Sequence, residues 1–101
     1  MPKESAAGSI TNAELVEFDN KVLELDPDEK LITGVTQAND LVVDVAITAG
    51  FSVMPDVQQG EVAIAMRDAL TKICECSPYL KFETEGGQRI VEIGNSQPKF
   101  K

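Results

Sequence analysis

Histidine and tryptophan are both absent from this sequence, which has one tyrosine and four phenylalanines among 101 residues. The lack of histidine removes the side chain that most often acts as a general base, binds zinc or changes charge near neutral pH. The sequence also lacks a GxxxxGK phosphate loop, a GxGxxG dinucleotide motif and the nucleophile elbow of hydrolases. We therefore expect a non-catalytic protein with no cofactor and no metal site.

Cysteine is scarce: there are only two, Cys74 and Cys76, with one residue between them. Residues two apart on a helix point to opposite sides, so within a helix these thiols could not easily form a disulfide. The spacing also differs from the CxxC motif of redox and zinc sites. We expect two free thiols and hence a reducing, intracellular compartment.

Long hydrophobic runs are missing as well. The longest apolar stretch, from Leu41 to Phe51, contains Asp44 and is far shorter than the ~20 residues of a membrane-spanning helix. The first nine residues lack the apolar core of a signal peptide. These absences lead us to expect a cytoplasmic protein with no membrane contact.

The length and composition are those of one small globular domain. Hydrophobic residues make up 43% of the chain and charged residues 26%, as in ordinary soluble domains. The small polar residues at both ends predict a flexible N-terminal tail over 1–9 and a flexible C-terminal tail over 95–101. We expect the globular domain to span residues 10–94.

Residues 12–25 carry the strongest helix signal. Thr11 and Glu14 have the spacing of a capping box, and an apolar stripe follows at spacings of three and four: Leu15, Phe18, Val22 and Leu25. Pro27 disfavours a helical conformation at Asp26, so we predict that the helix runs from Asn12 to about Leu25. The acids after it lack the ligand spacing of a calcium loop, and we interpret them as helix-capping residues.

Residues 30–49 allow two interpretations. Apolar residues recur at spacings of three and four from Leu31 to Ala49, which favours a helix. The β-branched residues at 31–36 and the alternation over 41–47 favour two strands around a turn at 37–40. Because Gly50 and Phe51 are typical of a helix C-terminus, we predict a helix from about Ala38 to Ala49, preceded by a short strand or helical turn over 30–36.

The C-terminal half predicts a helix followed by a hairpin. The helix begins near Pro55 or Asp56 and ends at about Cys76. Alternating residues at 79–85 and 88–93 flank Gly86-Gly87, which predicts a two-residue turn with left-handed dihedral angles. The expected register pairs Leu80 with Ile93, Lys81 with Glu92, and Phe82 with Val91. The predicted fold class is therefore α+β, a three-helix core with a C-terminal antiparallel β-hairpin.

Residues 44–52 resemble the end of the first helix and the turn of helix-turn-helix DNA-binding domains. Ala46, Gly50 and Ser52 match the small residue, the turn glycine and the polar residue of that motif. The element order is also similar to that of a winged helix, with Gly86-Gly87 at the wing tip. This resemblance implies a nucleic-acid-binding regulator whose nearest candidate contacts are Gln58, Gln59, Arg67 and Arg89.

Charge argues against that alternative. The chain has 17 acids against 9 bases, a net charge of −8, and its would-be recognition helix has Asp56 and Glu61 before its first base, Arg67. Such a surface repels phosphates, so nucleic acid is not the partner we expect. The acidic residues are concentrated in residues 1–29. An acidic surface in that region either keeps a small protein soluble or binds a basic partner.

We therefore expect a protein-interaction or regulatory protein that contacts a protein partner, such as a basic one, through Glu14, Glu17, Asp19, Glu24, Asp26, Asp28 and Glu29. A structural subunit of a larger assembly, such as a virion, is a further alternative. The predicted helix over 38–49 is apolar on nearly all sides, which predicts a homo-oligomer that buries the surplus surface.

Overall fold

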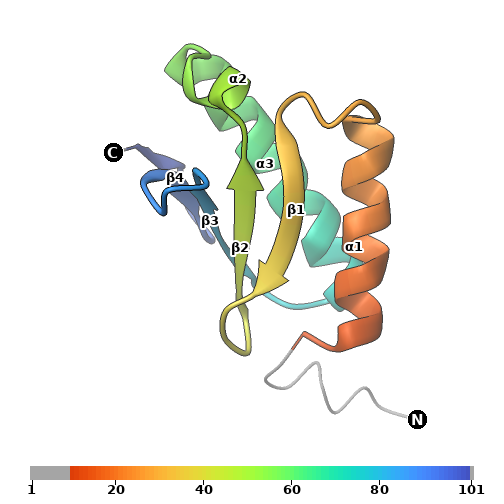
Figure 1. Cartoon of the computed structure of the whole chain (residues 1–101). Helices are drawn as coiled ribbons and strands as arrows, with labels where there is room; N and C mark the ends of the chain where they lie inside the picture. Colours follow the sequence, from red (N-terminus) through yellow and green to blue (C-terminus); the bar gives the residue numbers. More distant parts are fainter. Residues whose placement is uncertain (1–9, 101) are drawn as a thin grey trace, which may run out of the picture.

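The computed structural model describes residues 10–100 and has an α+β fold with three helices and a five-stranded mixed sheet (Figure 1). The elements are α1 (Asn12–Leu25), β1 (Ile32–Gln37), β2 (Val42–Ile47), α2 (Ala49–Ser52), α3 (Asp56–Cys74), β3 (Tyr79–Glu83), β4 (Arg89–Ile93) and β5 (Lys99–Phe100). The predicted α+β class is confirmed. Strands are not only C-terminal, however, because β1 and β2 precede the long helix α3.

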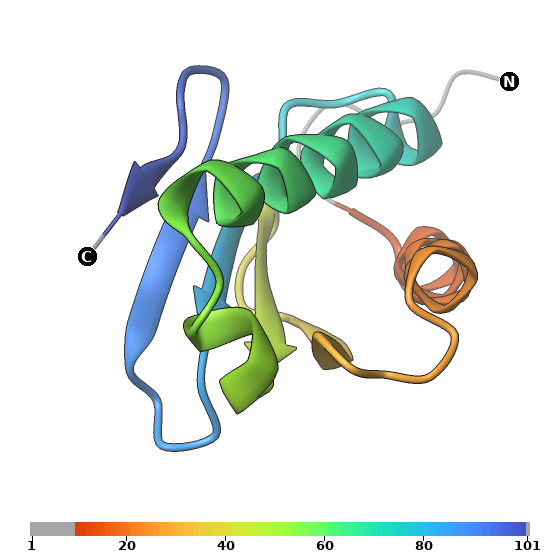
Figure 2. The same ribbon diagram turned by 90° about the horizontal axis from the view of Figure 1, so that it is seen from above.

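The strands lie side by side in the order β1-β2-β3-β4-β5. Neighbouring strands are antiparallel except for β2 and β3, which are parallel. A parallel pair needs a crossover connection, and the segment with α2 and α3 provides it. Figure 2 shows α3 crossing one face of the sheet, with α1 on the same side next to β1.

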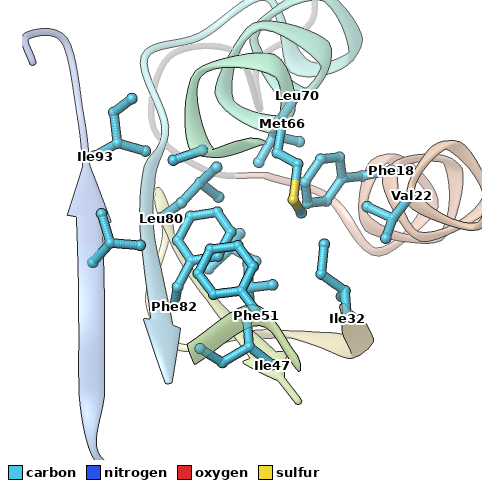
Figure 3. Close-up of a cluster of buried hydrophobic side chains, with 14 of the residues drawn as sticks. Phe18, Val22, Ile32, Ile47, Phe51, Met66, Leu70, Leu80, Phe82 and Ile93 are labelled. Atoms are coloured by element: carbon cyan, nitrogen blue, oxygen red, sulfur yellow. The ribbon is translucent and has the colours of Figure 1, made fainter. Parts of the chain in front are cut away.

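The core fills the space between the sheet and the helices (Figure 3). Phe18 and Val22 enter it from α1, and Met66 and Leu70 enter it from α3. The sheet contributes the inward residues of β1 to β4, among them Ile32, Val43, Val45, Ile47, Leu80, Phe82, Val91 and Ile93. Phe51 of α2 stacks on Phe82 with ring centroids 5.6 Å apart, which fixes α2 against the end of the sheet.

The predicted helix over 38–49 is wrong. Residues 42–47 form β2, in which Val43, Val45 and Ile47 are buried and alternate with half-buried neighbours. Gly50 does not end a helix in the left-handed conformation. It lies inside α2. This short helix begins at Ala49, where Thr48 caps it: the Thr48 side chain accepts a hydrogen bond from the Phe51 N–H.

Two further expectations depended on that helix. The helix-turn-helix resemblance does not extend to the structure, because Ala46 pairs with Gly34 in the sheet. The argument for self-association also loses its basis. The apolar residues of 41–47 are divided between the two faces of a strand instead of surrounding a helix.

The expectation of two free thiols is also wrong, because Cys74 and Cys76 form a disulfide. Helix α3 ends at Cys74, and Glu75 adopts a left-handed conformation with φ 53°. The chain thus leaves the helix between the two cysteines, so their side chains no longer point to opposite sides, and their Cα atoms are 5.2 Å apart, within the range that a disulfide spans. The disulfide is at odds with a reducing compartment, which we had inferred from free thiols.

The C-terminal hairpin is confirmed in its register. Leu80 pairs with Ile93, Lys81 with Glu92, and Phe82 with Val91. The turn differs from the prediction, since it has three residues, 85–87, closed by hydrogen bonds from Gly87 N–H to Thr84 O and from Thr84 N–H to Gln88 O. Of the three turn residues, only Gly87 has a positive φ, 86°. This is the three-residue loop with a final left-handed residue that commonly replaces the two-residue turn.

Only one of the two turn glycines is therefore expected to resist substitution. Gly87→Ala should destabilise the protein by about 1–2 kcal/mol, because L-residues other than glycine are strained in the left-handed region. Gly86→Ala is the matched control and should change the stability by less than about 0.5 kcal/mol. Urea unfolding followed by circular dichroism measures both. Equal effects at the two positions would contradict this assignment of the turn.

Lys99 and Phe100, which the sequence places in a polar tail, pair with Glu92 and Val91 as strand β5. The predicted domain boundary at residue 94 stays a prediction. The predicted tail over 1–9 lies outside the described residues. Within residues 10–100, no helix is both long and apolar enough to cross a membrane.

Candidate functional site

A hollow of the described surface lies between α1 and α3. These helices contact each other and lie side by side in Figures 1 and 2. The hollow has a volume of about 630 Å³, and its α1 wall consists of Glu17, Asn20, Lys21, Glu24 and Leu25. We call it the interhelical groove.

Small side chains of α3 keep the interhelical groove open. Ala65 and Ala69 lie one helical turn apart and face α1, with Ile73 a further turn along. A methyl side chain reaches less far from the helix axis than the Leu or Met side chains that fill the core. The floor is therefore apolar and recessed, while charged residues of both helices form its rim.

A smaller cavity continues from the groove toward β1. It has a volume of about 260 Å³ and shares Leu25 and Ala65 with the interhelical groove. Its other apolar lining residues are Val22, Leu31, Ile32, Val62 and Met66. Asp26 and Glu61 are its two acidic lining residues. We call it the side pocket.

Carboxylates outnumber cations around these two hollows. Glu17, Glu24 and Asp68 line the groove together with Lys21 and Lys72, and the side pocket adds two more acids and no base. Lys21 and Glu24 form an exposed ion pair of 3.5 Å, a kind that contributes at most about 1 kcal/mol. Glu17 and Glu61 make no ion pair with any residue between 10 and 100. Both carboxylates are available to a cation from outside.

The structure brings only part of the predicted acidic surface to the groove. Glu17 and Glu24 line it, seven residues apart on α1. Asp28 and Glu29 are exposed in the loop after α1, where Asp28 lies 4.0 Å from the Lys30 ammonium. Asp19 is half-buried on α1 and does not line either hollow.

Glu14 does not belong to that surface. It is buried, with 8% of its area exposed. Its carboxylate accepts the Thr11 N–H at 2.9 Å, while the Thr11 hydroxyl accepts the Glu14 N–H at 3.2 Å. This is the capping box that the sequence indicates, so the buried Glu14 carboxylate caps the start of α1.

Asp26 likewise has a structural role. Its carboxylate accepts the backbone N–H groups of Leu31, Ile32 and Lys30 at 2.8, 2.9 and 3.1 Å, which ties the end of α1 to the start of β1. Burial acts to raise the pKa of this carboxyl. The three N–H donors and the Lys30 charge outweigh burial and hold its pKa below the usual value of an aspartate.

Removing the Asp26 charge should therefore destabilise the fold. We expect Asp26→Asn to lose about 2 kcal/mol at neutral pH, because hydrogen bonds to an ionised group are among the stronger ones. A folded-state pKa below the unfolded value gives stabilisation that is present above about pH 4 and lost as the pH falls through the folded pKa. The difference in free energy of unfolding between Asp26→Asn and wild type should therefore become smaller below about pH 4. Urea unfolding at a series of pH values measures it.

Asp28→Asn is the control for this prediction, since Asp28 is exposed and close only to Lys30. Its effect should stay within about 0.5 kcal/mol. A gap between Asp26→Asn and wild type that stayed constant down to about pH 2 would contradict the assigned role.

The candidate nucleic-acid contacts do not gather on one surface. Gln59 is buried, and its amide donates to the carbonyl oxygens of Phe51 and Ser52. Arg67 donates to Gly94 O at 2.6 Å and pairs with Asp68. Arg89 is engaged on the sheet by Glu83 and Glu92. Of the four candidates, only Gln58 is exposed and makes no side-chain hydrogen bond or ion pair with another described residue.

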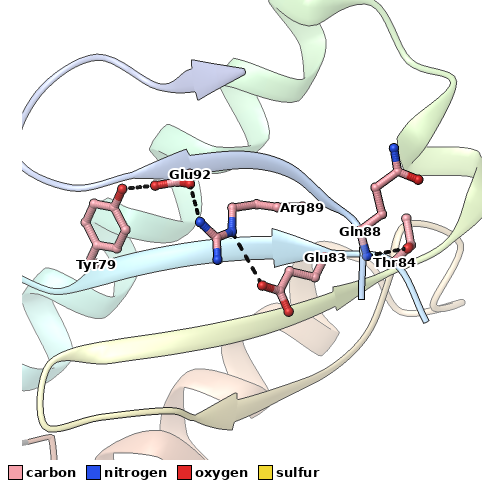
Figure 4. A network of polar contacts seen from close by, with 6 residues as sticks. All are labelled: Tyr79, Glu83, Thr84, Gln88, Arg89 and Glu92. Atoms are coloured by element: carbon pink, nitrogen blue, oxygen red, sulfur yellow. Dashed lines mark hydrogen bonds and ion pairs between the residues drawn. The ribbon is translucent and has the colours of Figure 1, made fainter. Parts of the chain in front are cut away.

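A polar network covers part of the sheet face away from α3 (Figure 4). The Tyr79 hydroxyl donates to Glu92, which also accepts from Arg89 at 2.7 Å. The hydrogen bond to Glu92, and secondarily burial, raise the pKa of Tyr79, so its phenol stays protonated at neutral pH. The network joins β3 to β4 and pairs the Arg89 guanidinium with the carboxylates of Glu83 and Glu92.

Sequence reasoning singled out Glu17 and Glu24 of the groove but missed Asp68 and the apolar floor. The alanines at 65 and 69, one turn apart on α3, were the available signal. Among residues 10–100, no group of three His, Cys, Asp or Glu side chains is arranged to hold a metal ion. Comparisons of the chain with protein-family models, curated proteins and solved structures gave no match.

Proposed function

We propose that this protein is a non-catalytic interaction protein whose interhelical groove binds a basic, partly apolar segment of a partner protein. One observation carries the proposal: an apolar floor and a rim of three carboxylates and two lysines occur together in the groove between α1 and α3. A recessed apolar surface bordered by charges is the usual character of a binding groove. The acids of the rim favour a cationic partner and speed its association.

The spacing of the acids favours a helical partner. Glu17 and Glu24 are seven residues apart, which places them about 10 Å apart along one side of α1. An amphipathic helix with lysines or arginines seven apart presents its charges at the same interval. Its apolar face then meets Ala65, Ala69 and Ile73, as in other complexes in which a helix lies in a groove.

A peptide of about 15 lysine and leucine residues with helical spacing is a direct probe. We expect the wild-type protein to bind it, and the affinity to fall as salt is raised from about 0.1 M to about 1 M. Glu17→Gln/Glu24→Gln should weaken binding about fivefold, because each exposed charge pair contributes about 0.5 kcal/mol. Fluorescence anisotropy of labelled peptide measures these affinities.

The control removes the same amount of charge elsewhere. Asp40 and Glu85 are exposed in turns of the sheet, outside the groove. Asp40→Asn/Glu85→Gln should retain nearly the wild-type affinity. If the two double variants lose affinity equally, net charge and not the groove drives binding, and the proposal fails. Absence of any binding by the wild-type protein would overturn it as well.

A further inference from the structure

The side pocket differs in character from the groove that it extends. At about 260 Å³ it is smaller than the roughly 300–1,000 Å³ that drug-sized ligands occupy. Its walls come from three elements, α1, α3 and β1, and are mainly aliphatic. A cavity of this size and lining suits one large apolar side chain.

The side pocket joins the interhelical groove and has an exposed carboxylate in its lining. Leu25, which is 57% exposed, lies at the junction of the two hollows, so a ligand in the groove can continue into the pocket. Glu61 lines the pocket, is exposed, and has no cationic partner between residues 10 and 100. Asp26 is occupied by backbone N–H groups, so Glu61 is the carboxylate that remains for a ligand.

We infer that the side pocket is the anchor site of the partner helix: it takes one large apolar side chain, and Glu61 pairs with a lysine or arginine next to that side chain. This inference rests on the proposed function of the groove and specifies the partner's chemistry. The partner helix then carries one bulky aliphatic or aromatic residue for the side pocket, in addition to the smaller apolar residues that contact the groove. Such a buried anchor commonly contributes a large share of the affinity of an interface.

The absence of tryptophan from this chain gives a clean readout. The probe is the lysine-leucine peptide with a single tryptophan in its apolar face, and its emission reports only on the peptide. We expect the emission maximum to move to shorter wavelength on binding, as the indole leaves water. A series with the tryptophan at successive apolar positions identifies the position that enters the pocket.

Two substitutions separate the pocket from the groove. Val62 lines only the side pocket and Ala69 only the groove. Val62→Phe should fill the pocket, abolish the emission shift and weaken binding about tenfold, as expected for one large apolar side chain. Ala69→Phe should weaken binding but leave the emission shift at saturation. Glu61→Gln, on an exposed side chain, tests the pocket without altering its packing and should weaken binding threefold or more.

The outcomes distinguish the two proposals. If the wild-type protein does not bind the peptide, the proposed function fails and this inference fails with it. If it binds while the tryptophan stays in water at every position, the groove stands and the anchor pocket is refuted. Equal affinity of wild type, Val62→Phe and Glu61→Gln also refutes the pocket. Circular dichroism confirms that each variant is folded before its affinity is compared.

Discussion

Val45→Asn is expected to destabilise the protein by about 4 kcal/mol. Val45 is fully buried at the centre of β2. The substitution loses roughly 2 kcal/mol of apolar burial and places an amide without a partner in the core, which costs a further 1–3 kcal/mol. A domain of this size has a total stability of about 5–15 kcal/mol, so this single change should remove a large share of it. Urea and thermal unfolding followed by circular dichroism measure the loss.

Val42→Asn is the matched control, and it also tests the strand assignment. Val42 lies in the same strand, three residues earlier, and is half-buried on the face away from α3. We expect it to cost about 1 kcal/mol or less. A helix over 38–49 would place positions 42 and 45 on one buried stripe, so both changes would then be severe. Equal losses at the two positions would contradict the strand.

Phe82→Ala is expected to cost about 3–5 kcal/mol, the usual loss when a buried phenylalanine is truncated. Phe82 is fully buried and stacks on Phe51, which is also fully buried. Phe51→Ala should have a similar cost, because α2 has only four residues and Phe51 is the residue it buries. Since the two rings contact each other, the double variant should lose about 0.5–1.5 kcal/mol less than the sum of the single losses.

Phe100→Ala is the control of the same residue type. Phe100 is 39% exposed in the two-residue strand β5, and its truncation should cost about 1–2 kcal/mol. A loss at Phe100 equal to that at Phe82 would contradict the position of the core. Additive losses for Phe51 and Phe82 would contradict their direct contact.

Local signals predicted the elements whose conformation depends on nearby residues. The capping box of Thr11 and Glu14 located the start of α1, and alternation around the glycines located β3 and β4 with their register. Both signals act within a few residues along the chain. They needed no knowledge of what the element packs against.

Residues 31–49 could not be assigned in this way, because their Val and Ala positions fit both a period of two and a period of 3.6. The strand forms through pairing with distant residues: Val43 lies next to Leu80, and Val45 lies next to Phe82. Such non-local pairing overrides local preference. The disulfide was missed for a related reason, since a left-handed glutamate between the cysteines has no sequence signal.

The candidate site likewise combines residues that the sequence could locate with features that form only when distant elements pack together. Glu17 and Glu24 could be placed on one side of a helix from their spacing alone. The role of Glu14 follows from its local capping box with Thr11, whereas that of Asp26 depends on the backbone N–H groups of Leu31 and Ile32 that the fold brings to its carboxylate. The side pocket could not be predicted, because its walls come from α1, β1 and α3 and exist only when these elements pack together.

The central claim is that the interhelical groove is the binding surface, and amide chemical-shift mapping of the ¹⁵N-labelled protein with the lysine-leucine peptide tests it most directly. The account predicts that the largest shifts fall on α1 and α3 residues of the groove, including Glu17, Glu24, Ala65 and Ala69. Residues on the sheet face away from α3, such as Lys81 and Glu92, should change little. Largest shifts on that sheet face, or shifts spread evenly over the acidic residues of the chain, would contradict the claim.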